Sequence, residues 1–196
     1  SAKVRAERIS TARGQGLRFT SEHSDKTVTT EVVEAREHGG IEFRIKILNR
    51  SSAPITSIKF PVLIAPRQLG GASDDDVLLL PVLDGGIVEN PLQEMPVQPD
   101  AHYTYPGPLS CQVVAYYDKT AGLYIAAHDS EGNPKRLGAT RLADGSLDLS
   151  IYHLRPSIAE PELAVDYAVV LDTFTGDWYT AAGKYRDWSL RQKWSR

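Results

Sequence analysis

The chain has 196 residues, of which 41% are hydrophobic and 24% charged, a composition typical of a globular domain that buries its core without disulfides. The net charge of -3, with no strongly basic face in the main body, argues against nucleic acid as a partner. The single cysteine, Cys111, excludes an internal disulfide and a Cys-based zinc site, but it leaves the compartment open. No apolar run approaches the roughly 20 residues of a membrane-spanning helix, so no membrane association is expected.

Two-residue alternation predicts strands from residue 26 onward. The segment 26–35 is rich in Val and Thr, which strands favour. In 41–47 the apolar residues share one face and the charged residues the other, which predicts a strand with one wet face. A turn over 49–54 precedes an extended segment at 55–64, where Pro61 indicates a sheet edge or a bulge.

The middle of the chain is less regular. A polar, glycine-bearing loop is expected over 65–76, followed by a short apolar strand and an Asp-Gly-Gly turn within 77–91. Four prolines in 92–110 predict a long ordered loop, because proline cannot continue a helix or a central strand.

Alternation returns near residue 109. It predicts antiparallel strands at 109–117 and 122–128, and a further hairpin about residues 144 and 145. The segment 162–174 is the most apolar, which indicates a central strand. Turn signals recur at roughly ten-residue spacing. We therefore expect a single large antiparallel β-sandwich over residues 1–175.

The closing segment, 176–196, predicts an α-helix. Asp177 is a suitable N-cap, and the basic residues toward the end complement the helix dipole. Apolar or small residues at helical spacing form one stripe that is expected to pack on the sandwich: Trp178, Ala181, Ala182, Tyr185 and Trp188. Trp194 has little chain left to pack against and is expected to be exposed.

Three stretches carry a resemblance to a known kind of domain: 49–63 (NRSSAPITSIKFPVL), 105–137 (YPGPLSCQVVAYYDKTAGLYIAAHDSEGNPKRL) and 176–194 (GDWYTAAGKYRDWSLRQKW). Together they resemble the N-terminal β-sandwich that precedes the catalytic TIM barrel in certain bacterial glycoside hydrolases, comparable to the endo-α-N-acetylgalactosaminidases. The resemblance implies a galactose-mutarotase-like supersandwich whose C-terminal helix leads into a barrel. That barrel would be the domain's partner within the same polypeptide.

The resemblance also implies a non-catalytic accessory role. In such proteins the barrel carries the acid and nucleophile carboxylates, so no residue of this chain is assigned to catalysis. The alternating strands and helices that a barrel needs are missing from this sequence. A surface that a barrel normally covers would, in a fragment, invite a homodimer.

A group of tyrosines and histidines is the candidate saccharide-facing patch, because sugar rings stack on aromatic faces while polar neighbours bind the hydroxyls. The alternative is that the tyrosines pack in the sandwich with their hydroxyls satisfied, and that the His-Asp pair is structural. The candidates are His102, Tyr103, Tyr105, His128 and Asp129, with Tyr116 and Tyr117 nearby in sequence.

No metal or cofactor is expected. The acidic run at 73–77 offers carboxylates suited to Ca²⁺, but it lacks the 12-residue loop pattern, and a solvated run of charges is the simpler interpretation. Two other functions stay open. One is a free carbohydrate-binding module, and the other is a mutarotase-like epimerase that pairs His102 or His128 with Asp129 or Glu131.

Overall fold

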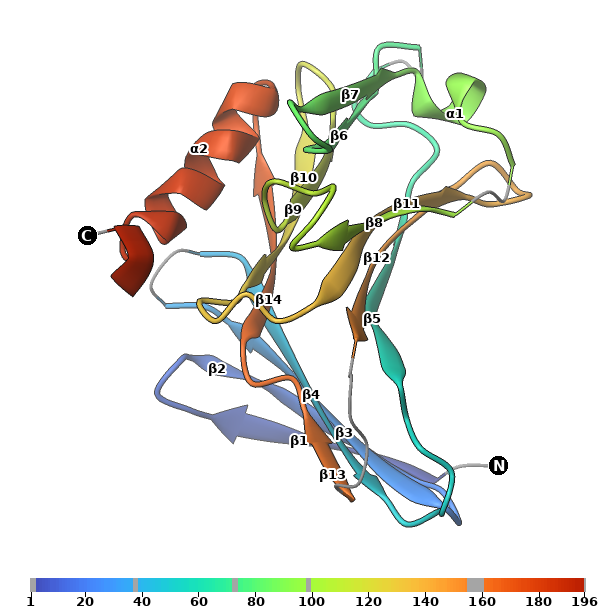
Figure 1. The fold of residues 1–196 in the computed structure, drawn as a ribbon, viewed down its shortest axis with the longest axis vertical. Helices are drawn as coiled ribbons and strands as arrows, with labels where there is room; N and C mark the ends of the chain where they lie inside the picture. Colours follow the sequence, from blue (N-terminus) through green and yellow to red (C-terminus); the bar gives the residue numbers. More distant parts are fainter. Residues whose placement is uncertain (1–2, 37–38, 72–73, 98–99, 155–160, 196) are drawn as a thin grey trace.

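The computed structural model describes residues 3–36, 39–71, 74–97, 100–154 and 161–195. It is an all-β sandwich of two antiparallel sheets with a C-terminal helix against one of them (Figure 1). Within the described residues, no helix has the length and apolar character needed to cross a membrane.

The large sheet has ten strands in the order β1-β2-β3-β4-β14-β10-β9-β6-β7, and β13 pairs separately with β4. Its strands are β1 (Lys3–Ser10), β2 (Gln15–Glu22), β3 (Lys26–Glu34), β4 (Ile41–Asn49), β6 (Val77–Leu80), β7 (Gly86–Glu89), β9 (Val113–Tyr117), β10 (Gly122–His128), β13 (Glu162–Ala164) and β14 (Ala168–Phe174).

The small sheet has four strands in the order β5-β12-β11-β8. These are β5 (Ser57–Ala65), β8 (Ala101–Tyr105), β11 (Lys135–Arg141) and β12 (Leu147–Leu154). The helices are α1 (Pro91–Glu94), α2 (Trp178–Ser189) and the 3-10 turn η1 (Lys193–Ser195).

The centre of the large sheet is covered on both faces. Figure 1 shows the small sheet on one side of β9, β10 and β14 and α2 on the other. Val169 packs into the cluster between the sheets, whereas its neighbour Val170 packs into the cluster under α2. A strand buried on both faces reads as a continuous apolar run, which explains the composition of β14. Each fully buried side chain of this size contributes about 1.5–3 kcal/mol.

Several predicted strands are confirmed, including the central position of β14 between β4 and β10. Pro61 lies in β5, an edge strand, beside a register shift between Ser150 and Tyr152 of β12. Two expectations need correction. The segment 92–110 is not a continuous loop, because it includes most of α1 and all of β8. Pro96 lies between α1 and β8, and Pro106 and Pro108 follow β8, so these three prolines interrupt neither element. Pro99 lies outside the described residues. The predicted strand at 162–174 is divided into β13 and β14.

The C-terminal helix begins where it was predicted. The carboxylate of Asp177 accepts a hydrogen bond from the backbone N–H of Tyr179 at 2.9 Å, an N-cap interaction. Ala181, Tyr185 and Trp188 are buried against the large sheet. The prediction that Trp178 is buried is wrong: it is 46% exposed, because it opens the helix and packs edge-on against Tyr179 instead of entering the cluster under the helix.

Candidate functional site

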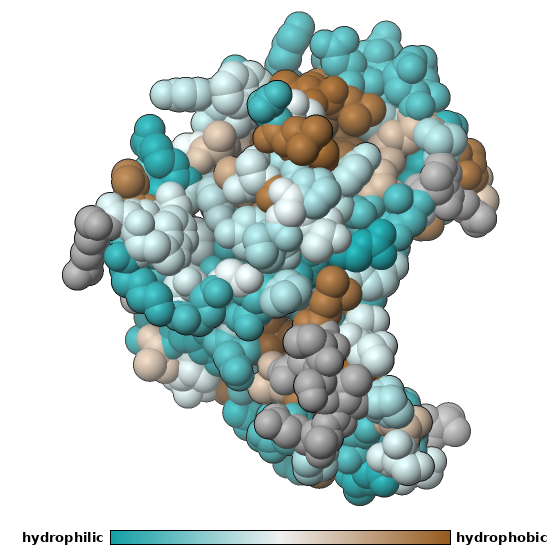
Figure 2. Space-filling view, in the orientation of Figure 1, coloured by the Kyte–Doolittle hydropathy of each residue, from teal (hydrophilic) through white to brown (hydrophobic). Residues whose placement is uncertain are grey.

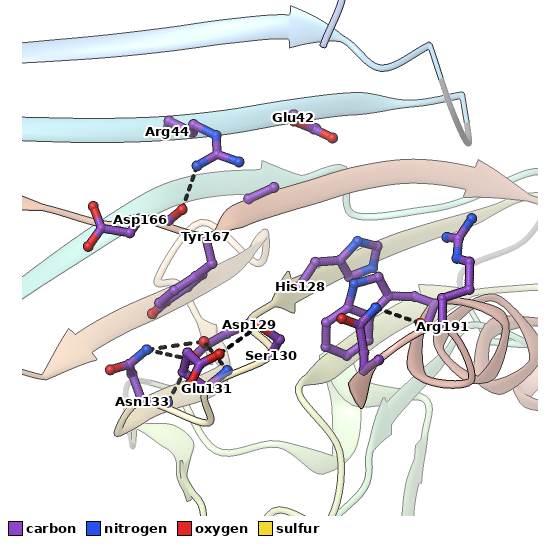
Figure 3. Close-up of a pocket in the computed structure, with 13 residues that line it drawn as sticks. Glu42, Arg44, His128, Asp129, Ser130, Glu131, Asn133, Asp166, Tyr167 and Arg191 are labelled. Atoms are coloured by element: carbon purple, nitrogen blue, oxygen red, sulfur yellow. Dashed lines mark hydrogen bonds between the residues drawn. The ribbon is translucent and has the colours of Figure 1, made fainter. Parts of the chain in front are cut away.

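A polar pocket of about 600 Å³ lies where the end of α2 approaches the turn that follows β10 (Figure 3). One wall is formed by Glu42 and Arg44 of β4, and another by Asp166 and Tyr167, which precede β14. The remaining walls are the turn of residues 129–133, His128, and the segment of α2 and beyond that carries Trp188, Arg191 and Gln192. Four separate parts of the chain therefore meet at this pocket.

Asp129 organises the turn at the base of the pocket. Its carboxylate accepts hydrogen bonds from the backbone N–H of Glu131 at 3.0 Å and of Asn133 at 2.6 Å, and from the Asn133 side-chain amide at 3.1 Å. A carboxylate bound in this way fixes the turn, as Asp does in Asx-turns. This geometry assigns Asp129 a structural task.

Lys135 lies beneath the turn and is fully buried. Its ammonium donates to Asp129 at 2.7 Å, to the Gln112 side-chain oxygen at 2.8 Å and to the Asn133 carbonyl at 2.5 Å. The same nitrogen lies 5.2 Å from the ring centre of Tyr105 and 4.8 Å from that of Tyr167. Burial lowers the pKa of Lys135, while Asp129 opposes the shift. A buried charge persists only with partners of this quality, so removal of either ion would leave the other unpaired.

His128 joins the pocket to α2. Its ring stacks on the indole of Trp188, with ring centres 4.7 Å apart and planes 11° from parallel. Trp188 is buried, and the indole of Trp194 meets its edge at 5.9 Å. Trp194 is 50% exposed, as expected, yet its Nε1 donates to the Ser130 carbonyl at 3.0 Å. The end of the chain is thereby attached to the rim of the pocket.

Arg44 supplies the opposite wall. Its Nη1 donates to the Asp166 carbonyl at 2.5 Å, while its Nε is buried without a hydrogen-bond partner among the described residues. Burial lowers the pKa of the Arg44 guanidinium, with Arg13 the next cause. On the open side, Lys193 pairs with the exposed carboxylate of Glu131 at 2.8 Å and holds the pKa of that carboxyl below its ordinary value.

The predicted saccharide patch is not assembled as one surface. His128 and Asp129 line the pocket, whereas His102 and Tyr103 lie in the small sheet. The two side chains lie on opposite faces of β8: His102 is buried on the outer face, and Tyr103, opposite Leu137 on the inner face, is 37% exposed because β8 is an edge strand. Tyr105 approaches the pocket only indirectly, through Lys135. Tyr116 and Tyr117 are buried on opposite faces of the large sheet.

His102 belongs to a second polar cluster, on the outer face of the small sheet. Its Nδ1 is hydrogen-bonded to Asp100, and its Nε2 lies 2.9 Å from Ser150 Oγ. The imidazole spans Gly138, the cross-strand partner of both His102 and Ser150. This order of atoms matches a Ser-His-Asp triad. Ser150 is only 1% exposed, however, so its hydroxyl is closed to a substrate and the chain of bonds is structural.

The acidic run at 73–77 is partly buried. Asp76 is buried and accepts from the hydroxyl of Tyr116 at 2.6 Å, while Asp75 is exposed; Ser73 lies outside the described residues. Ligand atoms of Asp75, Asp76 and Asp118 lie within 4.8 Å of one another. Burial raises the pKa of Asp76. The interpretation as a fully solvated run is therefore wrong for Asp76, whose carboxylate is a core acceptor.

The pocket also contains residues that the sequence did not single out, namely Glu42, Arg44, Asp166 and Arg191. Each occurs in an ordinary polar position of its segment, and they meet only because β4 pairs with β14 and α2 folds back over the sheet. No signal in the local sequence marks them.

No protein-family model matches the sequence, and no curated protein matches it. Solved structures of α-N-acetylgalactosaminidase NagBb from Bifidobacterium bifidum share the fold. Its GalNAc complex aligns with 96% of this chain at a TM-score of 0.65 and 15% identity, and its Gal-NHAc-DNJ complex aligns with 95% at 0.67 and 13%. In each case the chain spans only 30% of the length of the glycosidase chain. At such low identity the likeness shows a shared fold.

Proposed function

We propose that the chain is a non-catalytic accessory domain of a glycoside hydrolase that supports a catalytic TIM barrel of the same polypeptide. One observation carries this proposal: nearly the whole chain aligns with glycosidase chains, but with only 30% of their length. A unit of that kind leaves room in the parent protein for a separate catalytic domain. The galactose-mutarotase-like assignment of the sandwich belongs to the same proposal.

The pocket chemistry supports a non-catalytic role. A mutarotase-like reaction needs a positioned acid and base whose pKa values suit proton transfer near neutral pH. The Asp129 carboxylate is buried and occupied by Lys135 and three donors of the turn. Glu131 is exposed, and its ion pair with Lys193 keeps its pKa low. Neither carboxyl is prepared to protonate a sugar oxygen.

The outer face of α2 is the surface that would support the barrel. Trp178 and Tyr179 are exposed at its start, and Leu190 and Trp194 just beyond its end. Exposed apolar groups concentrated on one element mark an interaction site. A second apolar area lies at the end of the molecule that carries β6 and β7 (Figure 2), where Leu83 and Ile87 are exposed. The α2 face is favoured because the resemblance places the barrel after this helix.

The proposal is tested first by the reading frame beyond Arg196 and by hydrolysis. A TIM barrel encoded after residue 196 is expected, with hydrolysis of aryl glycosides by the longer polypeptide and none by residues 1–196. Hydrolysis by residues 1–196 alone would contradict the accessory role. A frame that closes without a barrel would contradict the proposed partner.

The docking face is tested by hydrogen exchange on α2. In the longer polypeptide, amides of residues 178–190 are expected to exchange more slowly than in residues 1–196 alone, because the outer face is covered. Amides of β7 serve as the internal control, since Ile87 lies on the other apolar area. Slowing at β7 and not at α2 would place the interface at the other apolar area.

Sedimentation of residues 1–196 tests separately for the expected homodimer. The variant Leu190→Ser should weaken this homodimer, and Ile87→Ser should not.

A further inference from the structure

We propose that the pocket beside α2 binds one unit of a neutral saccharide. Size is the first reason. A volume of about 600 Å³ falls within the range of small-molecule sites, which runs from roughly 300 to 1,000 Å³. The walls come from β4, the turn after β10, the start of β14 and the end of α2, so the pocket is a feature of the folded sandwich and not of one loop.

The lining offers the groups that a sugar needs. Figure 3 shows Tyr167 and His128 on opposite sides of the pocket, with Arg44 on a third. Carboxylates of Glu42 and Asp166 can accept bonds from hydroxyls, while the guanidinium groups of Arg44 and Arg191 can donate to them. Hydrogen bonds to ionised groups are about twice as strong as those between neutral ones. A polyol supplies donors and acceptors on every side and matches this mixture.

The charges of the lining are largely paired with one another or with neighbouring residues. Asp129 pairs with buried Lys135, Glu131 with Lys193, and Glu42 with Arg13 at 3.8 Å. The carboxylate of Asp166 remains beside the guanidiniums of Arg44 and Arg191, so the lining carries no large excess of either sign. A lining that offers donors and acceptors without a strong net charge suits a neutral hydroxylated ligand, and the choice of a saccharide rests on the proposed function.

Arg44 marks the wall where binding would gain most. Its Nε is buried without a hydrogen-bond partner among the described residues, although the same guanidinium bonds the Asp166 carbonyl through Nη1. Buried polar groups without partners are rare and costly in folded proteins. The Nε itself is closed to solvent, so a hydroxyl oxygen in the pocket would bond the part of the guanidinium that lines it, as a charge-assisted hydrogen bond. The binding energy is therefore expected to depend on the Arg44–Asp166 side of the pocket.

The test is saturation-transfer NMR and calorimetry on residues 1–196 with galactose, N-acetylgalactosamine, glucose and N-acetylglucosamine, and with inorganic phosphate as the anionic probe. We expect saturation transfer to at least one neutral sugar and no heat of binding for phosphate, which has no carbon-bound protons and is followed by calorimetry alone. Asp166→Asn and Arg191→Gln are both exposed positions and should preserve the fold. Each should raise the dissociation constant about tenfold, the loss of one charge-assisted hydrogen bond. Arg5→Gln, on β1, is the matched control and should change nothing.

The possible results test the ligand class and the location of the site separately. Binding of phosphate in place of sugar, or no transfer to any of the four sugars, would overturn the saccharide assignment. Sugar binding that is unchanged in both pocket variants would overturn its location. These results are independent of the reading frame and of hydrolysis, so failure here leaves the accessory role intact. Conversely, a chain without a downstream barrel can still give the expected binding.

Discussion

The two polar clusters of this sandwich are built from similar residues but differ in access. On the outer face of the small sheet, Asp100, His102 and Ser150 have the order of a catalytic triad, yet Ser150 is sealed from solvent. Beside α2, His128 lies in an open pocket whose base is a buried Asp129–Lys135 ion pair. The comparison teaches that hydrogen-bond geometry alone does not make a site, because a ligand must also reach it.

The largest effect on stability is expected from Lys135→Met, at the base of the open pocket. Asp129 would remain buried without its countercharge, so the free energy of unfolding should fall by about 3–5 kcal/mol. Urea denaturation measures the change. The double variant with Asp129→Asn should recover part of the loss, because the stranded charge is removed. A loss equal to that of the exposed change Lys193→Gln would show that the buried pair does not hold the turn.

The closed cluster is broken by Gly138→Ala. A Cβ at this position would lie 2.0 Å from the Ala101 carbonyl oxygen and 2.6 Å from the Cα of His102, so β8 must move away from β11. The cost of such overpacking is about 1–3 kcal/mol or more. The control is Gly183→Ala, where no atom lies within 4 Å and helix propensity should add about 0.5–1 kcal/mol of stability. Equal effects of the two changes would contradict the close packing of the triad-like row.

The same cluster should give the protein a dependence on pH. Burial is the main cause that lowers the pKa of His102, against the opposing effect of Asp100. The unfolded chain therefore binds a proton more readily, and stability is lost as the pH falls from the ordinary histidine value of about 6.5 toward the lowered folded value. The charges of Lys59 and Asp148 also act on this ring, Lys59 to lower its pKa and Asp148 to raise it.

His102→Gln is expected to reduce this loss. Denaturation midpoints at about pH 7.5 and about pH 5.5 should differ less in the variant than in the parent protein. His23→Gln, at an exposed histidine, is the control and should leave the difference unchanged. A parent protein that gains stability on acidification over this range would contradict a buried, neutral His102.

The smallest effect is expected at the rim of the open pocket. Lys193→Gln removes an exposed ion pair with Glu131, so the free energy of unfolding should hardly change. The hydrogen bond from Lys193 is the leading cause of the low pKa of Glu131, and this pKa should rise in the variant. A carboxyl-detected NMR titration of Glu131 follows the shift. An unchanged titration would mean that the end of the chain is not attached to the turn in solution.

Strands with clear alternation and the capped helix could be predicted from the sequence, because those signals are local. β4 and α2 are the clearest cases. β1 and β2 carry no such signal, since their residues are mostly exposed or half-buried and show no apolar face. β8 lies in a proline-rich segment, so its strand pattern is not apparent in the sequence. β1 and β2 are set by pairing with each other and with β3, and β8 by pairing with β11, so strand pairing and not local propensity sets these structures.

The candidate site was predictable only in part. His128 and Asp129 stand at the end of a predicted strand before a turn, which is where sites often form. Lys135 reads as an ordinary surface charge, and nothing local shows that it is fully buried beneath that turn. Arg44 and Asp166 are more than a hundred positions apart in the chain, so their contact follows from the sheet topology alone.

The pairing of β4 with β14 has a consequence for synthesis of the chain. Phe43 of β4 lies opposite Val169 of β14, so one edge of β4 cannot be completed until β14 has left the ribosome. The β1–β4 meander, which forms from consecutive strands, must wait with an open edge that can pair with other chains. Nascent chains stopped before residue 162 should therefore aggregate, and folding should be slow, because the central contacts are the longest in sequence.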